Sequence, residues 1–193
     1  MEEALPNFCF YRITDITPEF LKENNIKGIG IDLDNTTVYD SSYIALRGVK
    51  EWIKSIKAAD IPIIIITNTY PIRAVFFSKK FGVPYISLSN KPHTKNVKRA
   101  AEKLGVNIHE FALIGDMLFY DVKAANRSGA VSIKVEPFSR HKTFKKKNAK
   151  RRAKETAFIE EHKQEYPKIR GSLREKINER RNERNAAKDE QSD

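Results

Sequence analysis

Two acidic side chains follow an apolar run near the start of the chain, in the segment Asp32-Leu33-Asp34-Asn35-Thr36. Carboxylates two positions apart in an extended segment project to the same side, so Asp32 and Asp34 can serve one reaction centre. An aspartate nucleophile splits the hydrolysis of a phosphate ester into two displacements that pass through an aspartyl phosphate. A neighbouring carboxylate can protonate the departing alkoxide and later deprotonate the attacking water. The spacing therefore fits one acid that attacks and one that handles protons.

Three later clusters offer groups that phosphoryl transfer needs around the equatorial oxygens. They are Thr67-Asn68, Lys91-Pro92, and Gly115-Asp116 with Asp121. Thr67 offers a hydroxyl, Asn68 a backbone N–H and Lys91 a compact positive charge. Asp116 offers a hard oxygen ligand suited to Mg²⁺, and Asp121, one helical turn further on, can orient the waters of that ion. The four clusters together predict a magnesium-assisted phosphoryl-transfer site.

Each cluster also has an ordinary structural explanation when it is taken alone. Acids after a strand are often solvated turn residues, Thr67-Asn68 and Asp116 could cap helices, and Lys91-Pro92 could be a surface turn. The order of the clusters, each at the carboxyl end of an expected strand, favours the catalytic interpretation, because such ends meet at one edge of a parallel sheet.

Other metal and nucleotide motifs do not fit the first cluster. An EF-hand loop needs Gly and Glu at its sixth and twelfth positions, where this chain has Thr37 and Tyr43. Gly28 and Gly30 are followed by Leu33 instead of a third glycine, and the chain has no Walker lysine pattern.

Short apolar runs alternate with amphipathic segments between the clusters, which predicts an α/β fold with a three-layer, Rossmann-like parallel sheet. The continuous β-branched run of 61–66 is typical of a strand buried on both faces. We expect helices over 49–56, 71–80, 93–104 and 118–128, and strands over 29–31, 61–66, 83–88, 111–114 and 131–135.

The motifs resemble those of the haloacid dehalogenase superfamily of phosphatases, within it the YqeG-like branch of the IIIA group, over roughly residues 5–137. The resemblance implies Asp32 as nucleophile, Asp34 as acid/base, and Thr67 and Lys91 as the second and third motifs. It implies magnesium held by Asp32, Asp116 and the Asp34 backbone carbonyl. Gly115 and Asp121 belong to the fourth motif and, with Thr36, are supporting residues. The chain departs from the family pattern at Thr37, where an apolar residue is usual, and at Met117 and Tyr120, where polar residues are frequent.

Members of this superfamily usually carry a cap inserted after the first motif or between the second and third. Here the intervals from Asp34 to Thr67 and from Thr67 to Lys91 are filled by the helix and strand that each must contain. We therefore expect a capless, open site, which suits a large substrate. Relatives of the YqeG-like branch dephosphorylate phosphatidylglycerophosphate, and that lipid headgroup fits an open site.

Most of the formal net charge of +11 lies in residues 140–193. We expect a phosphatase domain over residues 1–139 and a basic, polar extension over residues 140–193, either helical or disordered. Its basic runs at 145–147 and 150–152 could contact anionic lipid or RNA phosphates, or remain solvated without a partner. Ser172-Leu173-Arg174-Glu175 resembles a capping box that opens a second polar helix.

The chain of 193 residues has one cysteine, Cys9, so it can form no internal disulfide. The first residues lack a basic leader, and no apolar run approaches the roughly 20 residues that span a bilayer. We expect a cytoplasmic protein, with any membrane contact peripheral at the inner face. The sequence does not indicate an oligomeric state.

Three functions remain open on the sequence. The favoured one is a magnesium-dependent phosphomonoesterase acting on a lipid headgroup such as phosphatidylglycerophosphate. The second is a capless phosphatase acting on nucleic-acid ends or on a phosphoprotein. The third is a ribosome- or RNA-associated protein with a vestigial site, and the presence of every motif residue argues against it.

Overall fold

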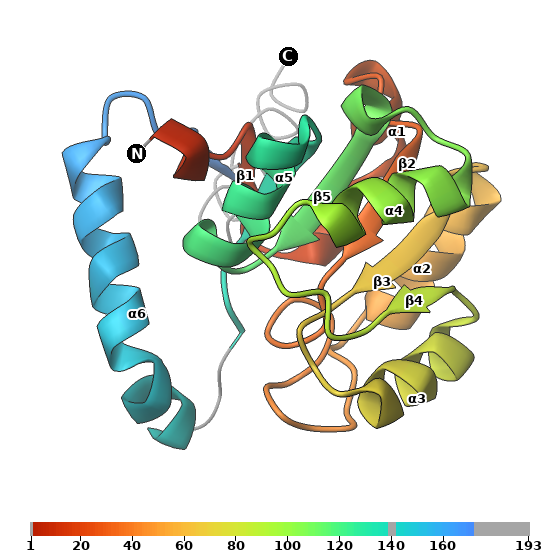
Figure 1. The fold of residues 1–193 in the computed structure, drawn as a ribbon, viewed down its shortest axis with the longest axis horizontal. Helices are drawn as coiled ribbons and strands as arrows, with labels where there is room; N and C mark the ends of the chain where they lie inside the picture. Colours follow the sequence, from red (N-terminus) through yellow and green to blue (C-terminus); the bar gives the residue numbers. More distant parts are fainter. Residues whose placement is uncertain (1, 139–141, 172–193) are drawn as a thin grey trace, which may run out of the picture.

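The computed structural model describes residues 2–138 and 142–171. Strands and helices alternate along most of this length (Figure 1). The strands are β1 Phe8–Phe10, β2 Gly28–Ile31, β3 Ile63–Ile66, β4 Tyr85–Ile86, β5 Phe111–Gly115, β6 Val131–Val135 and β7 Ile169–Arg170. The helices are α1 Pro18–Glu23, α2 Val49–Ala58, α3 Pro71–Phe81, α4 Lys95–Leu104, α5 Lys123–Ser128 and α6 Lys142–Glu161, with a π-helical turn at Leu118–Val122.

The described strands form one seven-stranded sheet in the order β4-β3-β2-β5-β6-β1-β7. Every pair of neighbours is parallel. β2 lies between β3 and β5, which is where the strand order changes direction along the chain. Ligands of open parallel sheets bind outside the carboxyl ends of the strands at such a point. The expected α/β fold with a parallel sheet is confirmed.

Helices cover both faces of the sheet, giving three layers (Figure 1). The alternation of side chains along β3 supplies both cores, because successive residues of a strand point to opposite faces. Ile63 and Ile65 pack in the core beneath α1, α2 and α3, whereas Ile64 and Ile66 pack beneath α4 and α5. The continuous β-branched run is thus buried on both sides, as a central parallel strand requires.

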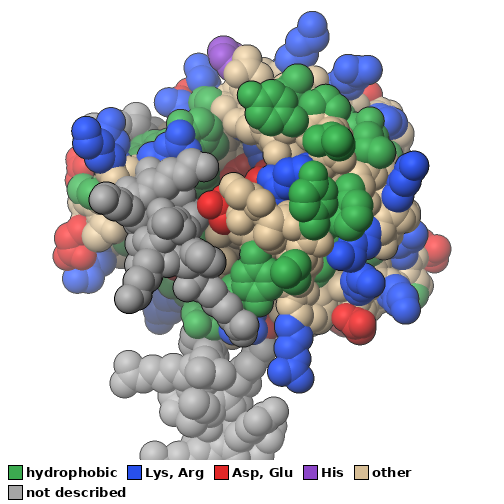
Figure 2. Space-filling model, turned by 90° about the horizontal axis from the view of Figure 1, so that it is seen from below, with side chains coloured by type: hydrophobic (Ala, Val, Ile, Leu, Met, Phe, Trp, Pro, Cys, Tyr) green, Lys and Arg blue, Asp and Glu red, His purple; other side chains and the backbone are tan. Residues whose placement is uncertain are grey.

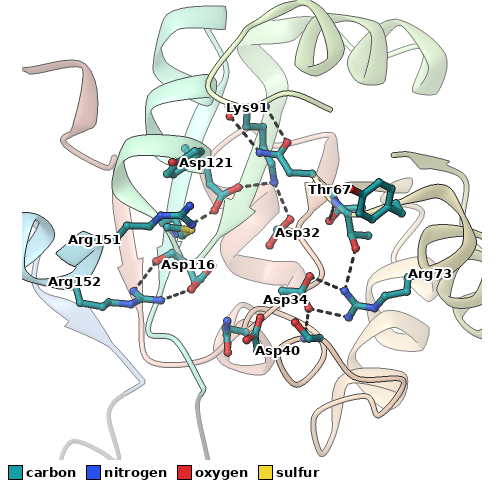
Figure 3. Close-up of a pocket in the computed structure, with 17 residues that line it drawn as sticks. Asp32, Asp34, Asp40, Thr67, Arg73, Lys91, Asp116, Asp121, Arg151 and Arg152 are labelled. Atoms are coloured by element: carbon teal, nitrogen blue, oxygen red, sulfur yellow. Dashed lines mark hydrogen bonds and ion pairs between the residues drawn. The ribbon is translucent and has the colours of Figure 1, made fainter. Parts of the chain in front are cut away.

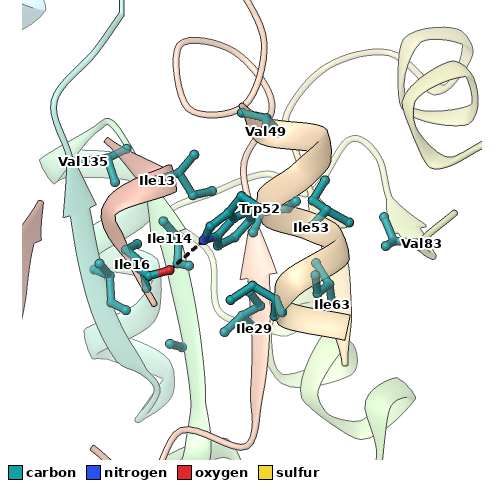
Figure 4. Close-up of a cluster of buried hydrophobic side chains, with 14 of the residues drawn as sticks. Ile13, Ile16, Ile29, Val49, Trp52, Ile53, Ile63, Val83, Ile114 and Val135 are labelled. Atoms are coloured by element: carbon teal, nitrogen blue, oxygen red, sulfur yellow. Dashed lines mark hydrogen bonds between the residues drawn. The ribbon is translucent and has the colours of Figure 1, made fainter. Parts of the chain in front are cut away.

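Trp52 joins α2 to the N-terminal segment of the domain (Figure 4). Its indole ring is buried, and its Nε1–H donates a hydrogen bond of 2.7 Å to the carbonyl of Ile16. Ile13 and Ile16 are also fully buried against this helix. The contact satisfies the polar group of a large core side chain, so α2 can pack tightly on the sheet below the site.

Two expected elements differ in detail from the structure. β4 is shorter than the strand expected over 83–88, since Pro84 offers no backbone N–H and Leu88 has a left-handed φ of 47°. The helix expected over 118–128 begins instead as the π-helical turn Leu118–Val122 and continues as α5. No additional domain is inserted between Asp34 and Lys91, all of which is described, in agreement with a capless architecture.

Residues beyond the expected domain boundary pack against the sheet. β7 pairs with β1, and Phe158 of α6 is 4% exposed in a cluster with Ala4, Leu118 and Val122. The Phe158 ring meets the Phe119 ring edge to face at 5.6 Å. The division of the chain at residue 139 stays a prediction. The expected capping box at residue 172 lies outside the described residues.

No helix among the described residues combines the length and the apolar character needed to cross a bilayer.

The burial of Phe158 leads to a first prediction. Phe158→Ala should lower the free energy of unfolding by about 3 kcal/mol, because it removes a buried aromatic ring and leaves a cavity. Lys154→Ala, at an exposed position of the same helix, should leave stability nearly unchanged and serves as the control. Urea unfolding of both variants tests this, and equal stabilities would mean that α6 does not belong to the folded unit.

Candidate active site

The parallel register brings the first and fourth motifs together. Ile31 of β2 lies opposite Ile114 of β5, so the residues that follow the two strands are neighbours. The Asp32 backbone N–H donates to the Ile114 carbonyl at 2.9 Å, and Asp116 follows directly after β5. Thr67 leaves β3 on the other side of β2, with its N–H donating to the Ile86 carbonyl.

A tight turn after Asp32 fixes the position of the first motif. Asn35 has a left-handed φ of 60°, a conformation that asparagine tolerates better than most residues. The Thr37 hydroxyl donates to the carbonyls of Asp32 and Leu33 at 2.9 and 3.2 Å. Thr36 is buried in the same turn. The hydroxyl of Thr37 thus ties the turn back onto the residue that bears the first carboxylate.

Lys91 stands at the centre of the site with its side chain almost wholly buried (Figure 3). Its Nζ lies 2.8 Å from Asp32 Oδ1 and 2.6 Å from Asp121 Oδ1, and it donates to the Ile66 carbonyl at 2.8 Å. Asn68 holds the backbone beside it: its Oδ1 accepts from the Lys91 N–H and its Nδ2 donates to the Lys91 carbonyl. The Asn68 side chain therefore positions Lys91.

Three buried carboxylates, those of Asp32, Asp116 and Asp121, converge so that their ligand atoms lie within 4.8 Å of one another. Such a cluster could hold a metal ion. The Asp121 Oδ2 also accepts from the Met117 N–H at 3.0 Å, which orients this carboxylate. A side chain at Gly115 would collide with the Asp121 carboxylate, so only glycine leaves room for the cluster.

Burial dominates the electrostatics of the cluster. Desolvation raises the pKa of Asp32 to about 8 against the opposing effect of Lys91, and the charges of Asp121 and Asp116 raise it further. Desolvation likewise raises the pKa of Asp116 to about 7, although Arg152 lowers it. The pKa of Lys91 is raised because Asp121 and Asp32 outweigh the desolvation of its ammonium. The site therefore favours binding of positive charge.

Asp34 points away from this cluster toward Arg73 of α3. The guanidinium donates two hydrogen bonds to the carboxylate, of 2.9 and 2.8 Å, and the Ser41 N–H donates a third of 2.8 Å. Arg73 also donates to the Thr69 hydroxyl and the Ser42 carbonyl. The pKa of Arg73 is raised because Asp34 outweighs desolvation. This bidentate pair links α3 to the loop that follows the first motif.

Helix α6 contributes a second arginine to the site (Figure 3). The Arg152 Nη2 lies 2.6 Å from Asp116 Oδ2, and its Nη1 lies 3.0 Å from Glu155 on the same helix. Glu155 is itself buried and accepts from the Leu118 N–H at 2.8 Å. The helix is thereby anchored beside the fourth motif.

The buried carboxylates, Lys91, Asp34 and the arginines line one cavity of about 520 Å³ at the carboxyl edge of the sheet. Arg73 forms one wall, and Arg151 and Arg152 form another. Asp40 and Tyr70 also contribute to the lining. Acidic groups at the base and guanidinium groups at the sides suit an anion that is bound together with a cation.

The structure gathers the residues expected from the sequence around this cavity. Asp32, Asp116, Asp121 and Lys91 form the buried cluster, and Thr67 and Asn68 line the same cavity. The Asp34 carboxylate stands outside the cluster, and the metal role expected of its backbone carbonyl stays a prediction. So do the roles expected of the Thr67 hydroxyl and the Asn68 N–H.

The sequence pattern did not indicate the roles of Arg73, Arg152 or Thr37. Arg73 follows the Thr67-Asn68 cluster by less than two helical turns, which is a weak signal that could have been used. Arg152 belongs to a basic run for which contact with anionic lipid, contact with RNA phosphates and no partner at all are the alternatives on the sequence. Thr37 departs from the family pattern on the sequence, and in the structure its hydroxyl holds the turn that follows Asp32.

Known proteins resemble this chain in sequence and in fold. The pattern of the haloacid dehalogenase-like hydrolases matches residues 17–129. The Bacillus subtilis (strain 168) protein described as "Probable phosphatase YqeG" is 38% identical over 133 residues, covering 69% of this chain and 77% of that protein.

Solved structures show a weaker likeness. A cobalt-bound deoxy-D-mannose-octulosonate 8-phosphate phosphatase of Haemophilus influenzae aligns at a TM-score of 0.49 and 17% identity, over 59% of this chain and 70% of that one. An uncharacterized protein of Listeria monocytogenes serotype 4b aligns at a TM-score of 0.48 and 17% identity, over 56% and 78%. At such scores the likeness says nothing of the reaction.

The sequence matches are the stronger finding. The family pattern spans more than half of the chain and contains all four motifs, and the Bacillus relative is 38% identical over more than two thirds of it. The chain therefore belongs to the haloacid dehalogenase-like hydrolases.

Proposed function

We propose that this hydrolase is a magnesium-dependent phosphomonoesterase that acts through an aspartyl phosphate on Asp32, on a lipid headgroup such as phosphatidylglycerophosphate. The observation that carries the proposal is the convergence of three buried carboxylates and Lys91 in one open cavity. Phosphoryl transfer is mostly positioning and charge neutralisation, and these groups supply both. The description of the Bacillus relative as a probable phosphatase supports the same reaction.

Asp32 is the proposed nucleophile because it lies at the base of the cavity beside the one buried ammonium that the described residues place there. Its oxygen would form a bond to phosphorus as the ester oxygen leaves, and water would then release inorganic phosphate. Lys91 holds the carboxylate and offers positive charge to the phosphoryl oxygens. Thr67, which follows β3 on the opposite side of β2 from Asp116, also lines the cavity.

Asp34 is the proposed acid/base. In the arrangement described, its carboxylate accepts hydrogen bonds from both Nη atoms of Arg73. For Asp34 to give a proton to the leaving alkoxide, its side chain must turn from Arg73 toward the cavity. Substrate binding could bring this about, because an anionic substrate would compete for the same guanidinium.

The residues present fit a divalent cation, since Asp32, Asp116 and Asp121 offer hard oxygen atoms that lie close together. We propose Mg²⁺ held by Asp32, Asp116 and the Asp34 carbonyl, with Asp121 in support. When bound, the ion would offset the repulsion between the Asp32 carboxylate and a phosphate dianion. Arg152 contacts Asp116, so its guanidinium would have to move for this carboxylate to bind the ion.

An open cavity suits a headgroup presented on a surface. No domain is inserted between the motifs in the described residues 2–138, so nothing in that part of the chain selects small soluble esters by enclosing them. The alternative is a phosphatase on nucleic-acid ends or on a phosphoprotein, which the three arginines of the cavity also favour. A side-by-side panel of phosphatidylglycerophosphate in vesicles, phosphorylated oligonucleotides and phosphopeptides would test this choice, and activity confined to the last two would overturn the lipid assignment.

Removal of the nucleophile gives a direct test of the reaction. Asp32→Asn should reduce hydrolysis of an aryl phosphate by at least about a thousandfold, because no other group in the cavity would form the covalent intermediate. Asp40→Asn, in the same cavity but outside the carboxylate cluster, is the matched control and should keep most of the activity. Comparable activity of Asp32→Asn and the control would show that Asp32 is not the nucleophile.

The contact between Arg152 and Asp116 predicts competition with the metal. Arg152→Ala should tighten Mg²⁺ binding by about threefold or more, since the guanidinium no longer neutralises the ligand. Calorimetric titration of the metal into the variant and into Lys154→Ala gives the comparison. Weaker binding in Arg152→Ala would show that the arginine supports the site instead of competing for it.

The raised pKa values of Asp32 and Asp116 predict how the metal stabilises the fold at different pH. Without metal, the folded protein keeps protons on these groups that the unfolded chain releases at about pH 4, so their effect lowers stability as pH rises toward about 8. A bound cation replaces those protons. The rise in Tm on addition of Mg²⁺ should therefore be larger at about pH 8 than at about pH 6, and equal rises would contradict the proton-linked site.

A further inference from the structure

Exposed apolar side chains gather at the mouth of the cavity. Six of the eight large hydrophobic residues that are exposed in the described part of the chain lie in segments that follow the carboxyl ends of β2, β3 and β4 or on α3, and we call them the apolar rim. The rim consists of Tyr43, Ile44, Tyr70, Ile72, Phe76 and Leu88. Figure 2 shows hydrophobic side chains on this face beside a hollow that contains acidic and basic groups. Clusters of this kind mark interaction surfaces on soluble proteins.

Contacts between its residues tie the rim together and to the site. The rings of Tyr43 and Phe76 meet edge to face at 5.0 Å, and Ile72 stands one helical turn from Phe76 on α3. The Leu88 N–H donates to the carbonyl of Thr69, next to Tyr70. Tyr70 also lines the cavity itself, so the rim begins where the cavity opens.

The side chains of the rim are unusually open to solvent for their size. Tyr70 and Ile72 are 75% and 74% exposed. Arg73, which lies between Ile72 and Phe76 in the sequence, turns inward to Asp34 instead. α3 thus buries Ala74, Phe77 and Phe81 in the core, and leaves Ile72 and Phe76 exposed on another side of the helix.

A basic band borders the rim on the side of α2. Lys50, Lys54 and Lys57 of α2 line a shallow hollow together with Lys80 of α3. Lys80 joins the two surfaces, because its Nζ lies 5.2 Å from the Phe76 ring centre and donates to the Tyr43 carbonyl at 3.2 Å. None of the four ammonium groups forms an ion pair with an acidic side chain in residues 2–138 or 142–171.

We propose that the apolar rim and the basic band dock the protein on an anionic phospholipid bilayer, with the cavity facing the headgroups. The apolar side chains of the rim suit the boundary between the headgroups and the acyl chains of such a bilayer. The neighbouring lysines suit its anionic headgroups. This inference rests on the proposed function, because a phosphatase that acts on a lipid headgroup must meet its substrate in the plane of the membrane.

A second copy of the chain would fit the same surface less well than a bilayer. A two-fold interface would bring the same surface of both copies together and place the lysine bands near each other. It would also cover the entrance of the cavity, whereas a bilayer brings substrate headgroups to it. The oligomeric state is therefore an outcome of the test.

The test is co-sedimentation of the full chain with vesicles of phosphatidylcholine alone or with about one third phosphatidylglycerol, neither of which carries a phosphomonoester. Wild type should partition onto the anionic vesicles. The double variant Ile44→Ser/Ile72→Ser should bind them about tenfold less, because it removes apolar groups that insert. Ile169→Ser, an exposed isoleucine away from the rim, is the matched control, and thermal unfolding verifies that each variant is folded.

Lys50→Gln/Lys54→Gln should weaken binding at low salt and have little effect at about 0.5 M salt, where charges are screened. Unchanged vesicle binding of the rim variant would overturn the proposal, as would a rim-dependent dimer in sedimentation velocity without a change in vesicle binding. Hydrolysis of a soluble aryl phosphate is measured on the same samples. Rim-dependent vesicle binding without hydrolysis would refute the proposed function and leave the docking surface standing.

Discussion

The ammonium group of Lys91, buried between Asp32 and Asp121, is the interaction on which the rest of the site depends. Charges removed from water are costly unless they are paired with good geometry, and removal of one partner leaves the others uncompensated. The surrounding structure maintains that geometry. Asn68 holds the Lys91 backbone on both sides, and Gly115 leaves the room that the Asp121 carboxylate occupies. Three carboxylates share one ammonium in this cluster, and because burial raises the pKa of Asp32 and Asp116, a cation can replace the protons on these groups.

Two arginines pair with carboxylates of the site from outside the strand ends. Arg152 reaches Asp116 from α6, and Arg73 reaches Asp34 from α3. Both come from helices whose packing depends on remote contacts: α6 is held by Phe158 and Glu155, and the loop beside α3 by Tyr43. The site therefore connects the sheet, the C-terminal helix and the exposed face of α3. A change in how either helix packs alters the electrostatics of the carboxylates without touching a motif residue.

The sheet and the motif residues could be predicted because they follow from local patterns. The β-branched run at 61–66 indicates a central strand, and acids directly after such strands must meet at one edge. β1, β7 and α1 were not expected as elements, since their short segments have little periodicity and form through pairing or capping within the fold. Arg73 and Arg152 were missed for a related reason. Their positions depend on long-range packing of a helix, and a basic residue in a polar run carries no local sign that it turns inward.

A structure of the protein with Mg²⁺ and beryllofluoride, which mimics a phosphoryl group on a carboxylate, tests the central claim most directly. We predict beryllium bonded to a carboxylate oxygen of Asp32, with Lys91 in contact with its fluorines and the metal bound by Asp116. Beryllofluoride bonded to Asp34, or a metal bound away from the Asp32, Asp116 and Asp121 cluster, would contradict the account.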